Sequence, residues 1–103
     1  MIARRRLPNR RDSETFRVRC EPFEYAATVS RFPDGTLAEI FISNGKAGSG
    51  SDTAAKDAAV VCSIALQFGV PLDVIRKALL RDPRGVASSP LGVALDQIAG
   101  ANQ

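Results

Sequence analysis

The spacing of apolar residues changes once along this chain, at the glycine-rich segment 45–50. Before this segment, apolar and polar residues alternate, which is the period of two expected of half-buried β-strands. After it, apolar residues recur at intervals of three and four, as on one side of a helix. Strands followed by helices predict an α+β fold, in which a three-stranded antiparallel sheet is followed by three helices packed on one face.

The strand-like part holds three segments. The first starts at Thr15, the second covers about residues 24–30, and the third is Leu37–Ser43. Residues 32–36, FPDGT, are typical of a turn, because proline presets φ and Gly35 accepts a positive φ. Short connections between neighbours favour an antiparallel meander. The third segment is apolar on both faces, so we interpret it as the central strand and expect an oligomer, most simply a two-fold dimer.

The helical part begins after the glycines. The apolar stripe of its first helix should face the core and consists of Ala54, Ala58, Val61, Ala65 and Phe68. Gly69 is suited to end this helix, and a short second helix starts near Pro71 or Leu72. The third helix has Ser89 as its predicted N-cap and Pro90 as its first residue.

Arginines are concentrated at the N-terminus. Residues 1–14 carry five of them with no hydrophobic period, so we predict a disordered basic arm, a single domain over residues 15–100 and a frayed tail over 101–103. A basic arm can bind the phosphate backbone of nucleic acids, although this one lacks the interleaved aromatic residues of single-strand binders. The candidates for nucleic-acid contact are Arg4, Arg5, Arg6, Arg10 and Arg11.

The composition argues against several functional classes. The chain has no histidine, the commonest general base and zinc ligand. Its two cysteines, Cys20 and Cys62, lack CxxC spacing, and we interpret them as reduced, buried side chains of a cytoplasmic protein. The longest apolar stretch, residues 58–66, is too short to span a bilayer, and no secretory signal follows the arginines. We therefore expect no membrane contact, metal, cofactor or catalytic residue.

The glycine-rich segment is a candidate phosphate site. Unpaired N–H groups at a helix start attract anions, and Lys46 could add a positive charge. The segment does not match the Walker A or dinucleotide-binding patterns, however. The alternative is architectural: glycines ease the reversal from sheet to helix while Ser51 or Thr53 caps the helix. The candidate ligand residues are Gly45, Lys46, Gly48, Ser49, Ser51 and Thr53.

The connection before the third helix, DPRGVASSP, is a second candidate. It places Arg84, Ser88 and Ser89 beside a helix start, where they could bind an anion or meet the glycine-rich segment. The simpler interpretation is that these residues cap and close the connection.

Motifs in residues 34–79 resemble a known family. The sequence shows EIFI at residues 39–42, GKAGS at 45–49, SIAL at 63–66 and GVP at 69–71, in that order. This series resembles the C-terminal TSCPD domain of adenosylcobalamin-dependent ribonucleotide reductases, over about residues 16–99. The motif that names the family falls on residues 87–91, ASSPL, so that Ser89 replaces its cysteine and Leu91 its aspartate.

The resemblance implies an accessory role rather than catalysis. Ribonucleotide reduction in that family requires a large barrel and three cysteines, whereas this chain has 103 residues and two cysteines. The first hypothesis is a non-catalytic module that binds a nucleotide or phosphate, or docks to a reductase or replication partner. The alternative is a small nucleic-acid-associated protein that acts through its arginine arm. An enzyme acting on its own is the least favoured interpretation.

Overall fold

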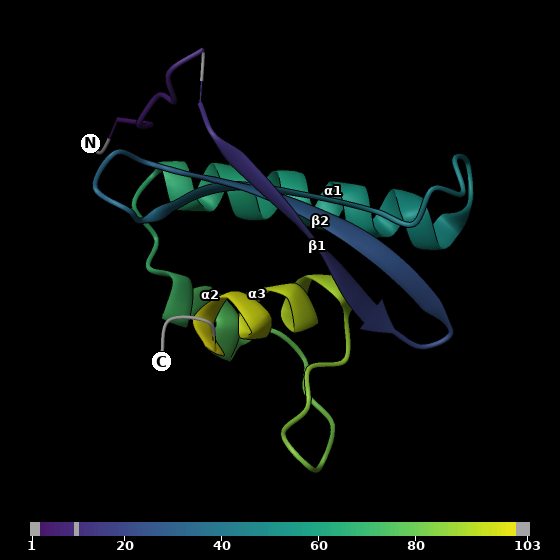
Figure 1. The fold of residues 1–103 in the computed structure, drawn as a ribbon. Coiled ribbons are helices and arrows are strands. Elements are labelled where there is room, and N and C mark those ends of the chain that lie inside the picture. Colours follow the sequence, from purple (N-terminus) through teal and green to yellow (C-terminus); the bar gives the residue numbers. More distant parts are fainter. Residues whose placement is uncertain (1–2, 10, 101–103) are drawn as a thin grey trace.

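The computed structural model describes residues 3–9 and 11–100, so Arg10 and the predicted tail 101–103 lie outside the described residues. Three strands precede three helices (Figure 1), which confirms the predicted α+β fold. The strands are β1 (Ser13–Cys20), β2 (Phe23–Arg31) and β3 (Leu37–Ser43). The helices are α1 (Gly50–Gln67), α2 (Leu72–Ala78) and α3 (Pro90–Gly100). Within the described residues, every helix is too short or too polar to span a lipid bilayer.

The sheet has the order β1-β2-β3, and both neighbouring pairs are antiparallel. The predicted meander is therefore confirmed. The prediction that the third strand is central is wrong, because β2 is central and β3 lies at an edge. In the register, Val29 of β2 pairs with Glu14 of β1 on one side and with Ile40 of β3 on the other.

Helix α1 runs along the outer edge of β3. Backbone groups on an open sheet edge need hydrogen-bond partners, and here polar side chains of α1 supply them. The Ser63 hydroxyl accepts a hydrogen bond from the Ile40 N–H at 2.9 Å. It can also donate one to the Ile40 carbonyl oxygen, at 3.0 Å. Gln67 Nε2 donates to the Ala38 carbonyl oxygen at 3.1 Å. The helix thus takes the place of a fourth strand, and this is why β3 is buried on both sides.

The helices and the sheet share one apolar core. Val18 and Ile40 from the sheet, Leu66 from α1 and Leu95 from α3 belong to the same buried cluster. The short helix α2 has no buried residue and packs at the margin through Ile75. The core therefore depends mainly on the sheet, α1 and α3.

The inward face of α1 differs from the prediction. Val61 and Phe68 were expected to face the core, yet they are 67% and 41% exposed. The buried apolar residues are instead Ala55, Ala59, Cys62 and Leu66, on the same side as the residues that bind β3. The hydrogen bonds to the backbone of β3 account for this orientation of the helix, which leaves Val61 and Phe68 toward solvent.

The N-terminal arm contacts the domain, although its described residues before Ser13 form no helix or strand. The Arg5 N–H donates to the Gln67 carbonyl oxygen at 2.7 Å, and Arg11 Nε donates to Glu39 Oε1 at 2.7 Å. Strand β1 begins at Ser13, so the sheet takes in two residues that were assigned to the arm. Disorder of the residues before Ser13 stays a prediction.

The ends of α1 and α3 follow the sequence signals. Gly69 has φ +93° after α1, and its N–H donates to the Leu66 carbonyl oxygen at 3.0 Å. Pro90 is the first residue of α3, and the Ser89 hydroxyl accepts from the Gly92 N–H at 3.1 Å. Both predicted helix boundaries are confirmed.

Gly92 has no room for a side chain. A Cβ at Gly92 would lie 2.9 Å from Ala87 Cβ, which cannot move without its backbone. Gly92→Ala should lower the free energy of unfolding by about 1 kcal/mol, because overpacking costs about 1–3 kcal/mol and the better helix propensity of alanine offsets up to about 1 kcal/mol. Urea unfolding followed by circular dichroism measures the change. Gly100→Ala is the control, since that Cβ meets nothing within 4 Å, and equal stability of the two variants would contradict the prediction.

Candidate functional site

The glycine-rich segment forms a turn that is closed by its own hydrogen bonds. Gly45 and Gly48 have φ values of +78° and +83°, so the turn needs glycine at both positions. The N-cap of α1 is Ser49, whose side chain accepts from the Asp52 N–H at 3.2 Å. The expectation that Ser51 or Thr53 caps the helix is wrong, because the helix begins at residue 50.

Asp52 places a negative charge inside the first turn of α1. Its side chain is 1% exposed and accepts from the Ser43 hydroxyl at 2.8 Å and from the Asn44 N–H at 2.9 Å. Lys56 Nζ lies 2.8 Å away on the next turn. The hydrogen bond with Lys56, followed by those from Asn44 and Ser43, holds the pKa of Asp52 below its usual value. The helix start already holds a carboxylate, so its geometry favours the architectural interpretation over an anion site.

Lys46 points toward the turn between β1 and β2. Its Nζ lies 4.7 Å from the centre of the Phe23 ring, within the range of a cation–π contact. Phe23 in turn packs edge-to-face with Tyr25. Lys46 therefore has a structural partner of its own.

The connection between α2 and α3 forms a small hairpin-like loop. Asp82 Oδ1 accepts from the N–H groups of Arg84 and Val86, which closes the loop around its carboxylate. The Arg84 side chain is 83% exposed and pairs with Asp82 at 3.4 Å. Ser89 is occupied as the cap of α3. Among the contacts of the described residues, none joins Arg84 to Lys46.

The β1–β2 turn instead contacts both candidate segments. Phe23 lies under Lys46, and Cys20 Sγ lies 3.8 Å from the Ser88 carbonyl oxygen. The two segments are thus neighbours of the same turn, and the structure does not bring their polar groups together.

The two thiols have little nucleophilic character. Cys62 is buried, and burial raises its pKa to about 11. Burial, with a smaller contribution from Glu21, also raises the pKa of Cys20. Within the part of the chain that the structure describes, no three acidic or cysteine side chains come together as metal ligands.

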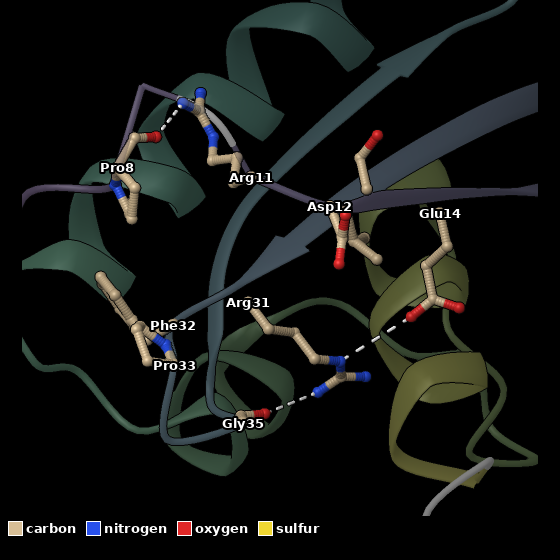
Figure 2. Close-up of a pocket in the computed structure, with 10 residues that line it drawn as sticks. Pro8, Arg11, Asp12, Glu14, Arg31, Phe32, Pro33 and Gly35 are labelled. Atoms are coloured by element: carbon tan, nitrogen blue, oxygen red, sulfur yellow. Dashed lines mark hydrogen bonds and ion pairs between the residues drawn. The ribbon is translucent and has the colours of Figure 1, made fainter.

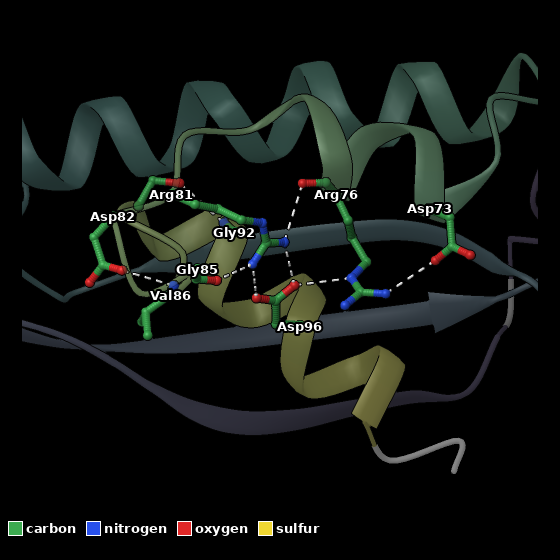
Figure 3. Close-up of polar contacts among 9 residues, drawn as sticks. Asp73, Arg76, Arg81, Asp82, Gly85, Val86, Gly92 and Asp96 are labelled. Carbon is green, nitrogen blue, oxygen red and sulfur yellow. Dashed lines mark hydrogen bonds and ion pairs between the residues drawn. The ribbon is translucent and has the colours of Figure 1, made fainter.

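An ion-pair network that the sequence did not suggest joins the hairpin-like loop to α3. Figure 3 shows Asp96 between Arg76 and Arg81. Arg81 donates to both carboxylate oxygens of Asp96, at 2.7 and 2.9 Å, and Arg76 Nε donates to Oδ1 at 3.0 Å. Arg81 also donates to the Gly85 carbonyl oxygen at 3.1 Å. These charges are paired with one another, so the network holds the fold together.

The pocket in Figure 2, about 480 Å³, lies between the arm and the β2–β3 turn. Its charged groups also pair locally. Arg31 donates to the Gly35 carbonyl oxygen at 3.1 Å and lies 3.8 Å from Glu14. Arg11 donates to the Pro8 carbonyl oxygen at 2.8 Å. With Asp12 in its lining as well, this pocket has no excess of positive charge for an anion.

Helix α1 presents an apolar surface to solvent, which we call the α1 surface. This surface consists of four side chains that are between 38% and 67% exposed, those of Val60, Val61, Ile64 and Phe68. Phe41 of β3, which is 51% exposed, lines a groove of about 360 Å³ together with Val60. The helical stripe predicted from the sequence included Val61 and Phe68 of this surface, but placed both in the core.

The family model and the relatives found among known proteins agree on one family. The TSCPD domain model matches residues 4–101. A vitamin B12-dependent ribonucleotide reductase of Rhodopirellula baltica is 39% identical over 72 residues, which are 70% of this chain and 7% of that protein. The enzymes of the same name from Agrobacterium fabrum and Bradyrhizobium diazoefficiens are 34% and 33% identical, over 68% and 71% of this chain and 6% of each protein.

The chain thus spans less than a tenth of the length of the curated relatives it matches. No solved structure gives a significant match. The family model covers the arm as well as the sheet and all three helices. This chain belongs to the TSCPD domain family.

Proposed function

We propose that this chain is a non-catalytic binding module that docks onto a ribonucleotide reductase. The α1 surface is the observation that carries the proposal. Single exposed apolar residues are ordinary, but a group of four on one helix, facing away from the core, is typical of an interaction site. The relatives supply the identity of the partner, since they are named as vitamin B12-dependent ribonucleotide reductases and hold the matching segment as a small part of a long chain.

The groove beside α1 extends this surface onto the sheet. Phe41 of β3 lines it together with Val60 and Lys56 of α1. An apolar side chain of the partner placed between Phe41 and Val60 would remove both from water, and burying such side chains provides most of the binding energy of protein interfaces.

The chemistry of the chain supports binding rather than catalysis. The reductase reaction implied by the family uses three thiols, and this chain offers Cys20 and the buried Cys62. Both thiols have raised pKa values and so carry little thiolate at neutral pH. A module without its own reactive groups can still act by placing, stabilising or regulating an enzyme.

Changing the α1 surface should prevent docking without unfolding the domain. In the variant Ile64→Glu/Phe68→Glu, both new carboxylates would have to be buried in the interface, so affinity for the reductase should fall at least about tenfold. The measurement is calorimetric titration of the purified chain into a purified vitamin B12-dependent ribonucleotide reductase from the same organism. Val74→Glu is the matched control, because Val74 is 56% exposed on α2 and outside the surface.

Two outcomes would overturn the proposal. One is wild-type binding that the double variant leaves unchanged. The other is a wild-type chain that sediments as a dimer and does not bind reductase, while the double variant sediments as a monomer. The second outcome would show that the α1 surface covers another copy of the chain, in the two-fold dimer expected from the sequence.

A further inference from the structure

A basic basin of about 650 Å³ lies where the arm crosses the end of α1 and the edge of β3. Four arginines and one acidic residue are in its described lining. The charged and polar side chains that line it are Arg4, Arg5, Arg6, Arg11, Glu39 and Gln67. The basin is separate from the glycine-rich segment, which lies at the opposite end of α1 (Figure 1).

Gln67 fixes the arm at this place. Its side chain is buried and is held by its bond to the Ala38 carbonyl oxygen. The amide oxygen of Gln67 accepts from Arg4 Nε at 2.6 Å, while its backbone carbonyl oxygen accepts from the Arg5 N–H at 2.7 Å. The Arg4 guanidinium is thus oriented by a residue that is itself locked against the sheet.

Arg11 is anchored in a similar way. Its Nε donates at 2.7 Å to Glu39, which is 7% exposed, and its Nη1 donates to the Pro8 carbonyl oxygen (Figure 2). The Nε groups of Arg4 and Arg11 therefore both donate hydrogen bonds to side chains of the domain. A guanidinium has five N–H donors, so this anchoring leaves terminal N–H groups that can bind an anion.

The charges do not cancel within the basin. Glu39 forms an ion pair with Arg11, while Arg5 pairs with Asp34 and lies over the Phe32 ring. Arg6 forms no ion pair with any described residue. Arg4, Arg5 and Arg11 attach the arm to the domain through their hydrogen bonds. This attachment does not account for Arg6.

We infer that this basin binds the polyphosphate group of a nucleotide. Guanidinium groups recognise phosphate oxygens in planar, paired hydrogen bonds, and several arginines around one hollow suit a compact, multiply charged anion. A nucleic-acid strand fits less well. The described lining contains no aromatic ring on which bases could stack.

Titration calorimetry of the chain alone tests the inference, independently of docking to a reductase. The probes are inorganic tripolyphosphate, ATP, AMP and a short single-stranded DNA at low salt. We expect tripolyphosphate and ATP to bind more tightly than AMP or DNA, with affinity that falls as salt rises. Arg6→Gln leaves the arm anchors in place and should weaken tripolyphosphate binding about tenfold, the effect of one charge-assisted contact.

Controls separate the basin from the other candidate sites. Arg84→Gln and Lys46→Ala should bind tripolyphosphate as the wild type does. The inference is overturned by any of three results: no binding of tripolyphosphate, DNA binding tighter than that of tripolyphosphate, or binding that is lost in Arg84→Gln or Lys46→Ala but not in Arg6→Gln.

Discussion

Replacing Ser63 by alanine should lower the free energy of unfolding by about 2–3 kcal/mol. Ser63 is 7% exposed, and its hydroxyl accepts from the Ile40 N–H and can donate to the Ile40 carbonyl oxygen. Ile40 is fully buried, so water cannot replace the lost partner. A buried backbone group without a hydrogen bond costs about 1–3 kcal/mol, and the edge of β3 depends on this one side chain at Ile40.

Thr53→Ala is a suitable control for Ser63→Ala. It also removes a hydroxyl from α1, but Thr53 is exposed, and the change should stay within about 0.5 kcal/mol. Urea unfolding followed by circular dichroism gives both values. If the two variants are equally stable, the Ser63 hydroxyl does not secure β3 to α1.

The alternating part of the sequence predicted the sheet well. The bounds of β3 agree with those expected, and Gly35 has the positive φ that the turn required. Turn residues and the period of two are local signals, and each acts within a few residues. The same holds for Gly69 and for Ser89 before Pro90, which end and begin helices as expected.

Predictions that depended on long-range contacts were less successful. The apolar residues of β3 indicated a central strand, because the sequence does not show that a helix rather than a strand covers its second edge. The face of α1 was assigned by apolarity alone, although Ser63 and Gln67 are spaced four apart on one side. Two polar residues so placed on an apolar helix are a signal that the helix binds backbone groups.

In the candidate sites, too, the local features could be predicted from the sequence and the long-range contacts could not. The sequence identified the glycine-rich segment, but not that Asp52 would be buried inside its helix start. It also identified the arginines of the arm, but not the residues of the domain that bind them. Gln67 and Glu39 bind Arg4 and Arg11 across 63 and 28 positions of the chain, which no local pattern can indicate. The basin is therefore a product of the fold.

The second large effect on stability concerns Asp96 and has a defined dependence on pH. Arg81, and to a lesser extent Arg76, lower the pKa of Asp96 to about 2. A carboxylate whose pKa is lower in the folded state stabilises the fold above its unfolded pKa of about 3.9, and this contribution is lost as the pH falls toward 2. Asp96→Asn removes the charge at nearly constant size, so that Arg81 loses its carboxylate partner and Arg76 keeps only its exposed ion pair with Asp73.

Near neutral pH, Asp96→Asn should therefore be less stable than the wild type by about 1–2 kcal/mol, a value that allows for the partial exposure of the pair. The difference should shrink as the pH is lowered from about 4 toward 2, because the wild-type Asp96 then becomes neutral too. Urea unfolding across this range measures it. Asp73→Asn is the control, since Asp73 is 71% exposed and forms a surface ion pair with Arg76, so the change should be under about 0.5 kcal/mol. A difference between wild type and Asp96→Asn that stays constant with pH would mean that the shape of the side chain, and not its charge, holds the loop to α3.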